Sequence, residues 1–272
     1  MPSFFEKELE ISGLTGKNDL LYLGAERCAE IIILNKKDMS HVGTIPIIND
    51  SIKGGIEIEG LSIFKNFIFI ADEKKGRIFT LNLETKTLSR VIVKGTDLSK
   101  FTNGFGMEGI AVEESTKLLY LLREKNENHQ SEIHTFRISE EENSIHLNHK
   151  TQTLIQHENK HWRYSGLAID SAQKRLLCLK QYYIKDDNLT KLNKREIEYV
   201  SLDSLKKNKT IPSPLLSLSK EIYEQRKSFA SNIEGIYFDN KSIFITSDNG
   251  GGKTRDCNEI TTKTVMIKIE TN

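Results

Sequence analysis

The sequence lacks the features that define several large protein classes. Among its 272 residues are three cysteines, Cys28, Cys178 and Cys257, with no CxxC pair, so we expect buried thiols rather than a zinc motif or a disulfide framework. No run of 18 apolar residues occurs, which excludes a membrane-spanning helix. The 39 basic and 38 acidic residues leave a formal net charge of +1. Such a balance gives no attraction of the whole chain to a nucleic-acid polymer or to an anionic membrane.

An export signal is also absent from the N-terminal residues. The segment MPSFFEKELEISG has no basic stretch followed by an apolar run. We therefore expect a cytoplasmic protein unless an export signal precedes residue 1. With 37% hydrophobic and 28% charged residues, the composition predicts a soluble chain with long polar loops. The length suits one large all-β domain.

Two motifs of catalytic sites are missing as well. No GxSxG segment occurs, so covalent acyl chemistry has no support. The segment NGGGKT at 249–254 is similar to the end of a phosphate-binding loop, but Ser247 stands where that motif requires its first glycine. The next structured segment, TVMIKIE, is strand-like rather than helical. We therefore reject a P-loop.

The sequence does contain a five-fold internal repeat. Each copy begins with an apolar run that carries a Ser-Gly or Glu-Gly dipeptide: LEISGLTG at 9–16, IEIEGLSI at 56–63, FGMEGIAV at 105–112, WRYSGLAI at 162–169 and SNIEGIYF at 231–238. A polar turn, a second apolar run and a third β-rich segment follow, and most copies have a fourth, such as 41–47 and 88–95. Short strands separated by polar turns predict an all-β protein, and a four-stranded unit of this length is typical of a β-propeller blade.

The spacing of the copies gives the number of blades. The dipeptide glycines stand at 13, 60, 109, 166 and 235, so the intervals are 47, 49, 57 and 69 residues. Known blade repeats span about 40 to 50 residues before insertions. We predict one five-bladed β-propeller domain over 1–272, with insertions in blade four at about 182–194 and 203–230. A strand at 4–10 is expected to complete blade five and close the ring, which removes an exposed sheet edge.

The residue before each of these glycines is expected on the propeller axis, because the first strand of every blade lines the central channel. The five residues are Ser12, Glu59, Glu108, Ser165 and Glu234. Three carboxylates that face one another repel unless a cation neutralises them. Carboxylate and hydroxyl oxygens in a flexible ring favour Ca²⁺ over Mg²⁺. The alternative is a wet channel in which the glutamates bind backbone amides or water.

Charged residues just past each second strand should surround the mouth of the same channel. The candidates for ligand binding are Arg27, Lys74, Arg123, Lys125, Lys180 and Asp248. Basic side chains beside an axial dication suit the oxygens of a phosphate group, and Asp72 or Glu124 could orient a hydrolytic water. The alternative is that these charges pair with one another on exposed turns.

Other polar residues contribute less to this prediction. His161 and Arg163 precede Ser165 and could approach the site from the strand entrance. The histidines between 129 and 161 form no metal-binding pair near the axis, and we interpret them as loop and outer-strand residues.

The order Ser, Glu, Glu, Ser, Glu before five blade-initial strands resembles the calcium-activated nucleotidases (apyrases), five-bladed propellers with one calcium ion on the axis. The segments EIEGLSIFKNFIFIADEKKGRIFTLNL at 57–83 and MEGIAVEESTKLLYLLREKN at 107–126 are more similar to the SdiA-regulated propeller family, which shares the axial pattern. The resemblance covers nearly the whole chain. It implies an axial Ca²⁺ and basic loop residues at Arg27, Arg123 and Lys180. The chain departs from the nucleotidases because it lacks their acidic and aromatic loop signatures.

These patterns favour a calcium-binding propeller that binds, and could hydrolyse, a phosphate-containing small molecule such as a nucleotide or phosphoester. The alternative is a non-catalytic propeller in which calcium holds the blades together and the mouth binds a peptide, a glycan or a protein. A glycosidase would need a carboxylate pair that straddles the sugar. The five-fold register of the axial residues argues for shared coordination instead. The substrate and the oligomeric state stay open.

Overall fold

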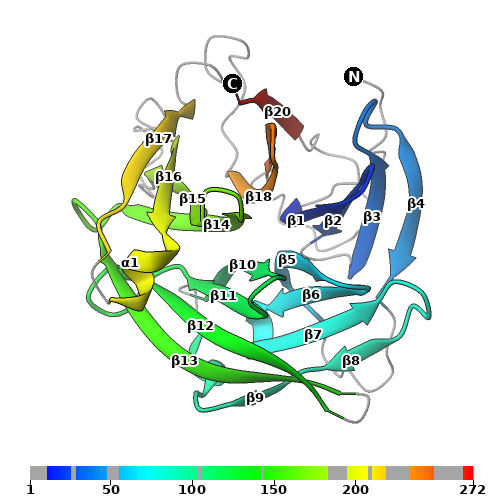
Figure 1. The fold of residues 1–272 in the computed structure, drawn as a ribbon, viewed down its shortest axis with the longest axis horizontal. Helices are drawn as coiled ribbons and strands as arrows, with labels where there is room; N and C mark the ends of the chain where they lie inside the picture. Colours follow the sequence, from blue (N-terminus) through cyan, green and yellow to red (C-terminus); the bar gives the residue numbers. More distant parts are fainter. Residues whose placement is uncertain are drawn as a thin grey trace.

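Five β-sheets surround a central channel in the computed structural model (Figure 1). The structure describes residues 11–25, 29–47, 55–102, 106–141, 144–182, 195–207, 210–218, 233–247 and 266–271. The first strand of each sheet lies nearest the axis and contacts the first strand of the next sheet, and the fifth sheet contacts the first. The predicted five-bladed all-β propeller is therefore confirmed.

The first two blades are four-stranded, as predicted. Their strands are β1 (Ile11–Lys17), β2 (Leu20–Ala25), β3 (Glu30–Asn35) and β4 (His41–Pro46) in blade one, and β5 (Ile58–Phe64), β6 (Phe67–Asp72), β7 (Arg77–Asn82) and β8 (Leu88–Arg90) in blade two. Each strand pairs in antiparallel fashion with the one before it in the sequence.

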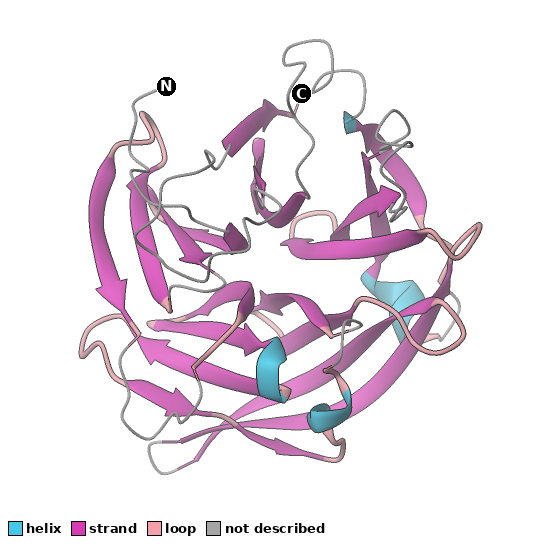
Figure 2. Cartoon of the chain, turned by 180° about the vertical axis from the view of Figure 1, so that it is seen from behind, coloured by secondary structure: helices cyan, strands magenta, loops and turns pink. Residues whose placement is uncertain are grey.

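The other three blades differ in size within the described ranges. Their strands are β10 (Met107–Glu113), β11 (Leu118–Arg123), β12 (Gln130–Glu141) and β13 (Ser144–Gln156) in blade three, β14 (Trp162–Asp170), β15 (Arg175–Tyr182), β16 (Arg195–Ser201) and β17 (Ser213–Ser217) in blade four, and β18 (Ile233–Asp239), β19 (Ser242–Ser247) and β20 (Met266–Glu270) in blade five. The helical segments are short and lie away from the axis (Figure 2): η1 (Glu73–Lys75), η2 (Leu98–Lys100) and α1 (Leu202–Lys206).

Two predicted segments have a different structure. The strand expected at 88–95 breaks at Val91, and its second half, β9 (Ile92–Lys94), pairs in parallel with β13 of blade three. β9 can pair with blade three because the β12–β13 hairpin, with strands of 12 and 13 residues, is long enough to reach alongside β9. In the insertion predicted at 203–230, residues 213–217 form the fourth strand of blade four. The strand predicted at 4–10 lies outside the described residues.

The hydrophobic core lies between neighbouring blades. The second strand of several blades is buried almost throughout, as in β2, β6 and β11. Successive side chains point to opposite faces of a sheet, so both faces of these blades are covered. Between blades two and three, Phe69 of β6 belongs to one buried cluster with Leu121 and Phe136. Between blades five and one, Phe244 of β19 packs with Leu21 and Leu23 of β2. The ring is thus closed by hydrophobic packing as well as by strand contacts.

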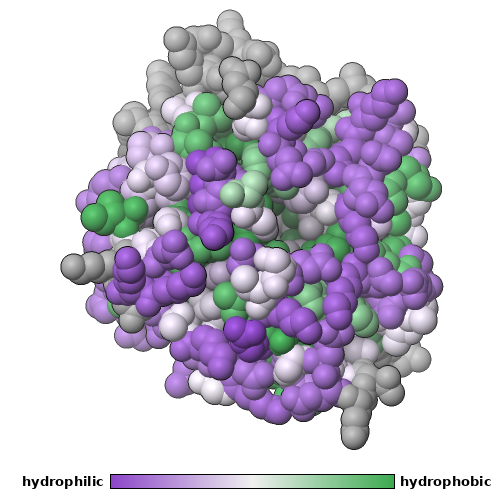
Figure 3. Space-filling model, viewed as in Figure 1, coloured by the Kyte–Doolittle hydropathy of each residue, from purple (hydrophilic) through white to green (hydrophobic). Residues whose placement is uncertain are grey.

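One face of the molecule is mainly polar. This face, shown in Figure 3, is predominantly hydrophilic, with smaller hydrophobic patches between the hydrophilic regions. No helix in the described part of the chain is long and apolar enough to span a lipid bilayer.

Candidate functional site

A β-bulge occurs at the same place in the first strand of every blade. The register of β1 with β2 passes from Ile11 to Gly13 and skips Ser12. Equivalent shifts in the other blades skip Glu59, Glu108, Ser165 and Glu234. A bulge takes its extra residue out of the hydrogen-bonding ladder and redirects its side chain. The bulges therefore mark the five residues that the sequence predicts for the axis.

The glycine after each bulge lies against the backbone of another blade. A Cβ atom on Gly60 would lie 3.0 Å from the Cα atom of Gly109, and one on Gly109 would lie 2.7 Å from the nitrogen of Leu167. A Cβ atom on Gly166 would lie 2.2 Å from the carbonyl oxygen of Glu234. Only glycine allows such a close approach of backbones. This predicted role of the glycines is confirmed, and it brings the bulges together around the axis.

The two axial serines both bind blade five. Ser12 Oγ donates a hydrogen bond to Glu234 Oε2 at 2.7 Å. Ser165 Oγ donates to the carbonyl oxygen of Ile233 at 2.6 Å. Glu59 of blade two is buried, with 6% of its surface exposed. Blade five is thus joined at this level to both of its neighbours in the ring.

Glu108 lies among charges of its own sign. Part of its surface is accessible, but the protein around it removes most of its contact with water. This desolvation raises the pKa of Glu108 well above its ordinary value, and the charges of Glu124 and Glu234 raise it further. Among the groups that act most strongly on Glu108, the acids are Glu73, Glu124 and Glu234, and Arg163 is the base. The acids therefore outnumber the base in this axial group.

Arg163 is the central cation of this group. Its Nη1 atom lies 2.9 Å from Glu124 Oε1. Burial acts to lower the pKa of the guanidinium, but the charges of Glu124 and Glu108 raise it overall. The sequence predicts only a minor role for Arg163, at the strand entrance of the site. The signal for this residue is its position two residues before Ser165 in the same strand.

Lys125 is a second cation near Glu124. Its Nζ atom donates to the carbonyl oxygen of Lys160 at 2.7 Å. Burial lowers the pKa of this ammonium group, the negative charge of Glu124 opposes the shift, and the positive charge of Arg163 adds to it. The structure thus brings Lys125 and Glu124, predicted for ligand binding and water activation, next to the acidic axial group.

Other cations predicted for the ligand already have carboxylate partners. They are Lys74 with Glu57 at 2.9 Å, Arg123 with Glu132 at 3.3 Å, and Lys180 with Glu158 at 2.8 Å and Glu198 at 2.7 Å. This pairing is the alternative that the sequence left open. Arg27 and Asp248 lie outside the described residues.

Asp72 forms a buried ion pair at the end of β6. Its Oδ2 atom accepts a hydrogen bond from Arg77 Nε at 2.7 Å, and its Oδ1 atom accepts one from the backbone nitrogen of Glu57 at 3.0 Å. Burial raises the pKa of Asp72, and these two contacts oppose the rise. Both carboxylate oxygens are therefore held by protein donors, whereas Glu124 lies within the axial group.

The donor atoms of the axial group suit a hard cation, since they are carboxylate and hydroxyl oxygens. In the described ranges, however, no three side chains of His, Cys, Asp or Glu are arranged to hold a metal ion. A cation would require the glutamate side chains to turn toward a common point. The mutual repulsion at Glu108 is the feature that such an ion would relieve.

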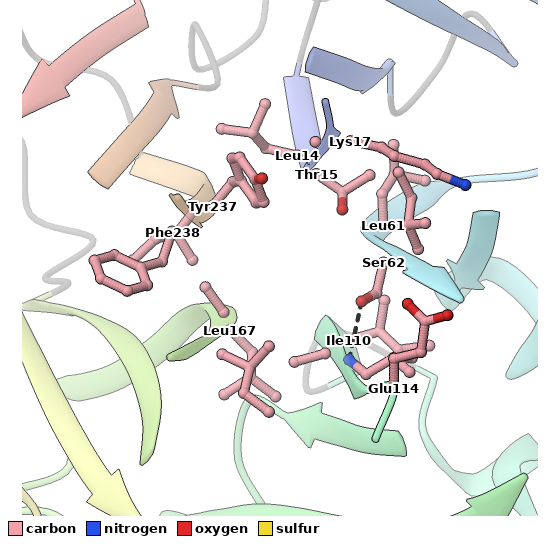
Figure 4. Close-up of a pocket in the computed structure, with 17 residues that line it drawn as sticks. Leu14, Thr15, Lys17, Leu61, Ser62, Ile110, Glu114, Leu167, Tyr237 and Phe238 are labelled. Carbon is pink, nitrogen blue, oxygen red and sulfur yellow. Dashed lines mark hydrogen bonds between the residues drawn. The ribbon is translucent and has the colours of Figure 1, made fainter. Parts of the chain in front are cut away.

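Beyond the glycines, each blade contributes one apolar side chain to the lining of a central cavity. The residues that follow the five glycines are buried and line a cavity of about 200 Å³: Leu14, Leu61, Ile110, Leu167 and Ile236. Figure 4 shows Leu14, Leu61, Ile110 and Leu167 around its open centre, with the hydroxyl groups of Thr15, Ser62 and Tyr237 nearby. Lys17 and Glu114 add one base and one acid to the lining of this cavity.

Fold and site together define a five-bladed propeller with an acidic group on its axis. Within that class, the chain belongs to the SdiA-regulated family, whose model matches residues 11–214. Among solved structures, a chain of the nidogen/laminin complex is similar, with 14% identity, a TM-score of 0.51 and coverage of 88% of this chain and 73% of that one. Glutaminyl cyclase of Myxococcus xanthus shows 12% identity, a TM-score of 0.51 and coverage of 89% and 87%. These structures share the fold, and no curated protein matches the chain.

Proposed function

We propose that this propeller binds a hard divalent cation, Ca²⁺, in its axial ring, and a phosphate-containing small molecule beside that ion. The observation that carries the proposal is the position of Glu108, whose pKa is raised well above its ordinary value first by desolvation and then by the charges of Glu124 and Glu234. Arg163 offsets only part of this negative charge. A dication would neutralise the rest.

The ligands would come from the bulges: Ser12, Glu59, Glu108, Ser165 and Glu234. Calcium takes six to eight oxygen ligands at about 2.3 to 2.6 Å in flexible geometry, so water would complete such a set. Bulges suit this role because each one holds a side chain at the axis independently of the ladder. The bound ion would also link the blades at the level of their inner strands.

The phosphate group would bind at the cation and at Arg163 and Lys125, which already lie beside the acidic group. A guanidinium matches phosphate oxygens, and a dication polarises them. Lys74, Arg123 and Lys180 would have to exchange carboxylates for the ligand. For hydrolysis, Glu124 is placed better than Asp72 to orient a water, because both oxygens of Asp72 are held.

The paired cations also support a second candidate function. If Lys74, Arg123 and Lys180 keep their carboxylate partners, the mouth has fewer charges for a phosphate. The protein would then be a non-catalytic, calcium-stabilised module that binds a peptide, a glycan or a protein.

The first experiment is a calcium titration of metal-free protein, followed by thermal unfolding and calorimetry. A ligand that binds only the folded state stabilises it by about 2.7 kcal/mol at one hundred times its Kd. We expect Glu108→Gln to weaken calcium binding at least tenfold. Without calcium the same variant should be more stable than the wild type, since a neutral amide removes the repulsion. Glu141→Gln, at an exposed position in β12, is the control and should behave as wild type.

A wild-type protein that gains no stability from calcium, or a Glu108→Gln variant that gains as much stability as wild type, would refute the axial site.

The second experiment measures phosphate release from nucleoside triphosphates and phytate, with calcium or with a chelator. Calcium-dependent release that Glu124→Gln reduces would establish the hydrolase. Calcium binding without release would favour the binding module.

A further inference from the structure

Two histidines of blade three come together on neighbouring strands. His134 Nδ1 in β12 lies 3.3 Å from His149 Nε2 in β13. The register of this hairpin passes from Thr135 opposite Thr151 to Phe136 opposite His149, and so skips Lys150. The bulge at Lys150 moves His149 toward His134. Bulges of this kind often redirect a side chain beside a functional site.

The second nitrogen of His134 is fixed by a carboxylate. His134 Nε2 lies 3.0 Å from Glu132 Oε2, and Arg123 Nη1 lies 3.3 Å from the same oxygen. Because a carboxylate paired with arginine only accepts hydrogen bonds, the proton of a neutral His134 belongs on Nε2. Its Nδ1 atom then presents a lone pair toward His149. A histidine that donates to a carboxylate while its other nitrogen is bare is the usual arrangement of a metal ligand.

The distance between the two facing nitrogens also fits a metal ion. His134 Nδ1 and His149 Nε2 lie 3.3 Å apart, and each of them can present a lone pair when its ring carries its proton on the other nitrogen. Two imidazole nitrogens at about 2.0 to 2.1 Å from a tetrahedral zinc ion are roughly 3.3 to 3.4 Å apart. The two rings could therefore hold one ion without a large movement.

Aromatic rings beside the two histidines leave one side of the pair open to an ion. The ring of Phe101 lies 4.7 Å from the ring of His134, and the ring of Phe136 lies 5.2 Å from that of His149. His134 is buried, with 3% of its surface exposed, while His149 is partly exposed. Water and a metal ion can thus reach the pair from the side of His149.

We propose that His134 and His149 bind one divalent transition metal ion, with Cu²⁺ bound most tightly and Zn²⁺ and Ni²⁺ less so. Imidazole ligands suit these ions, and their affinities follow this general order. Water completes the coordination, and Glu132 holds His134 in position. The site is separate from the proposed axial calcium site, because calcium prefers oxygen ligands. Arg123, expected at a phosphate, here supports Glu132.

The test is a titration of tag-free protein with Cu²⁺ and Zn²⁺ by calorimetry, with electron paramagnetic resonance on the copper form. We expect one tight equivalent of Cu²⁺ and a spectrum with two coupled nitrogens. His149→Ala and His134→Ala should each weaken binding at least tenfold. Glu132→Gln should weaken it about 10- to 100-fold, as loss of such supporting carboxylates does elsewhere. His41→Gln, at an exposed histidine of β4, should leave binding unchanged.

Either of two results would overturn the proposal: a wild-type protein that takes up no tight equivalent of Cu²⁺, or a His149→Ala variant that binds as wild type does. His149 is only partly buried, so this variant remains informative if the His134→Ala variant fails to fold. Circular dichroism of each variant checks the fold. Copper binding that is unchanged by excess Ca²⁺ would support a site distinct from the axial ring, and competition between the two ions would contradict it.

Discussion

Ser12 Oγ of the first blade donates a hydrogen bond of 2.7 Å to Glu234 Oε2 of the last blade, across 222 positions of sequence. The same seam carries an ion pair farther from the axis, where Lys36 Nζ lies 2.6 Å from Asp239 Oδ2. The ring of blades is therefore closed by polar contacts at two levels. Both contacts join the first blade to the last, segments that are far apart in the sequence.

Replacing Ser12 with alanine should weaken this seam. Hydrogen bonds to charged groups contribute about 1.5 to 3 kcal/mol, and the variant leaves Glu234 without this donor. We expect a loss of that size in the free energy of unfolding, measured by urea denaturation without added metal. Ser89→Ala, in the exposed part of β8, is the matched control and should change stability by no more than about 0.5 kcal/mol. Equal effects of the two substitutions would show that the seam contact contributes little.

The axial positions could be predicted because they repeat. A dipeptide at five matching places gives both the strand and the blade, and the structure adds that each of Ser12, Glu59 and their equivalents lies at a bulge. The closeness of the glycines was also predictable, since a propeller narrows toward its axis. These are local features, and their geometry is the same in every blade.

Contacts that depend on strand register could not be predicted in the same way. Arg123 reaches Glu132 because β11 and β12 pair with these two residues opposite each other. His134 reaches His149 only because the register shifts at Lys150. A shift of one residue would place either side chain on the other face of the sheet. The sequence alone does not show where such shifts occur.

Gly166 offers a direct test of close packing at the axis. Its Cβ position lies 2.2 Å from the carbonyl oxygen of Glu234, which is backbone and cannot move freely. We expect Gly166→Ala to destabilise the protein by about 1 to 3 kcal/mol or more, the usual effect of overpacking. Gly43→Ala in β4 is the control, because a Cβ atom there meets nothing within 4 Å. Chemical denaturation of both variants checks this, and similar stabilities would contradict the observed packing.

His157 should make the fold sensitive to mild acid. Its Nε2 atom lies 2.7 Å from Ser131 Oγ, and its ring packs edge-on against Tyr164 at 4.8 Å. Burial first, and then the charge of Lys180, lower the pKa of His157 to about 4. An unfolded histidine titrates near 6.5, so the unfolded chain binds the proton more tightly between these values. This residue therefore favours unfolding increasingly as the pH falls from about 6.5 toward 4.

The expected size of this effect follows from the two pKa values. Between pH 7 and pH 5, His157 should cost about 2 kcal/mol of stability, because each pKa unit corresponds to about 1.4 kcal/mol. Ser131 Oγ donates its proton to the carbonyl oxygen of Glu124 and accepts from His157 Nε2. His157→Gln keeps a donor for Ser131 but cannot titrate, so it should lose less stability than wild type over this range by that amount. Urea denaturation at pH 7 and pH 5 measures the difference, with the exposed His41→Gln as control. If His157→Gln and wild type lose stability in parallel, His157 is not the group that responds to acid.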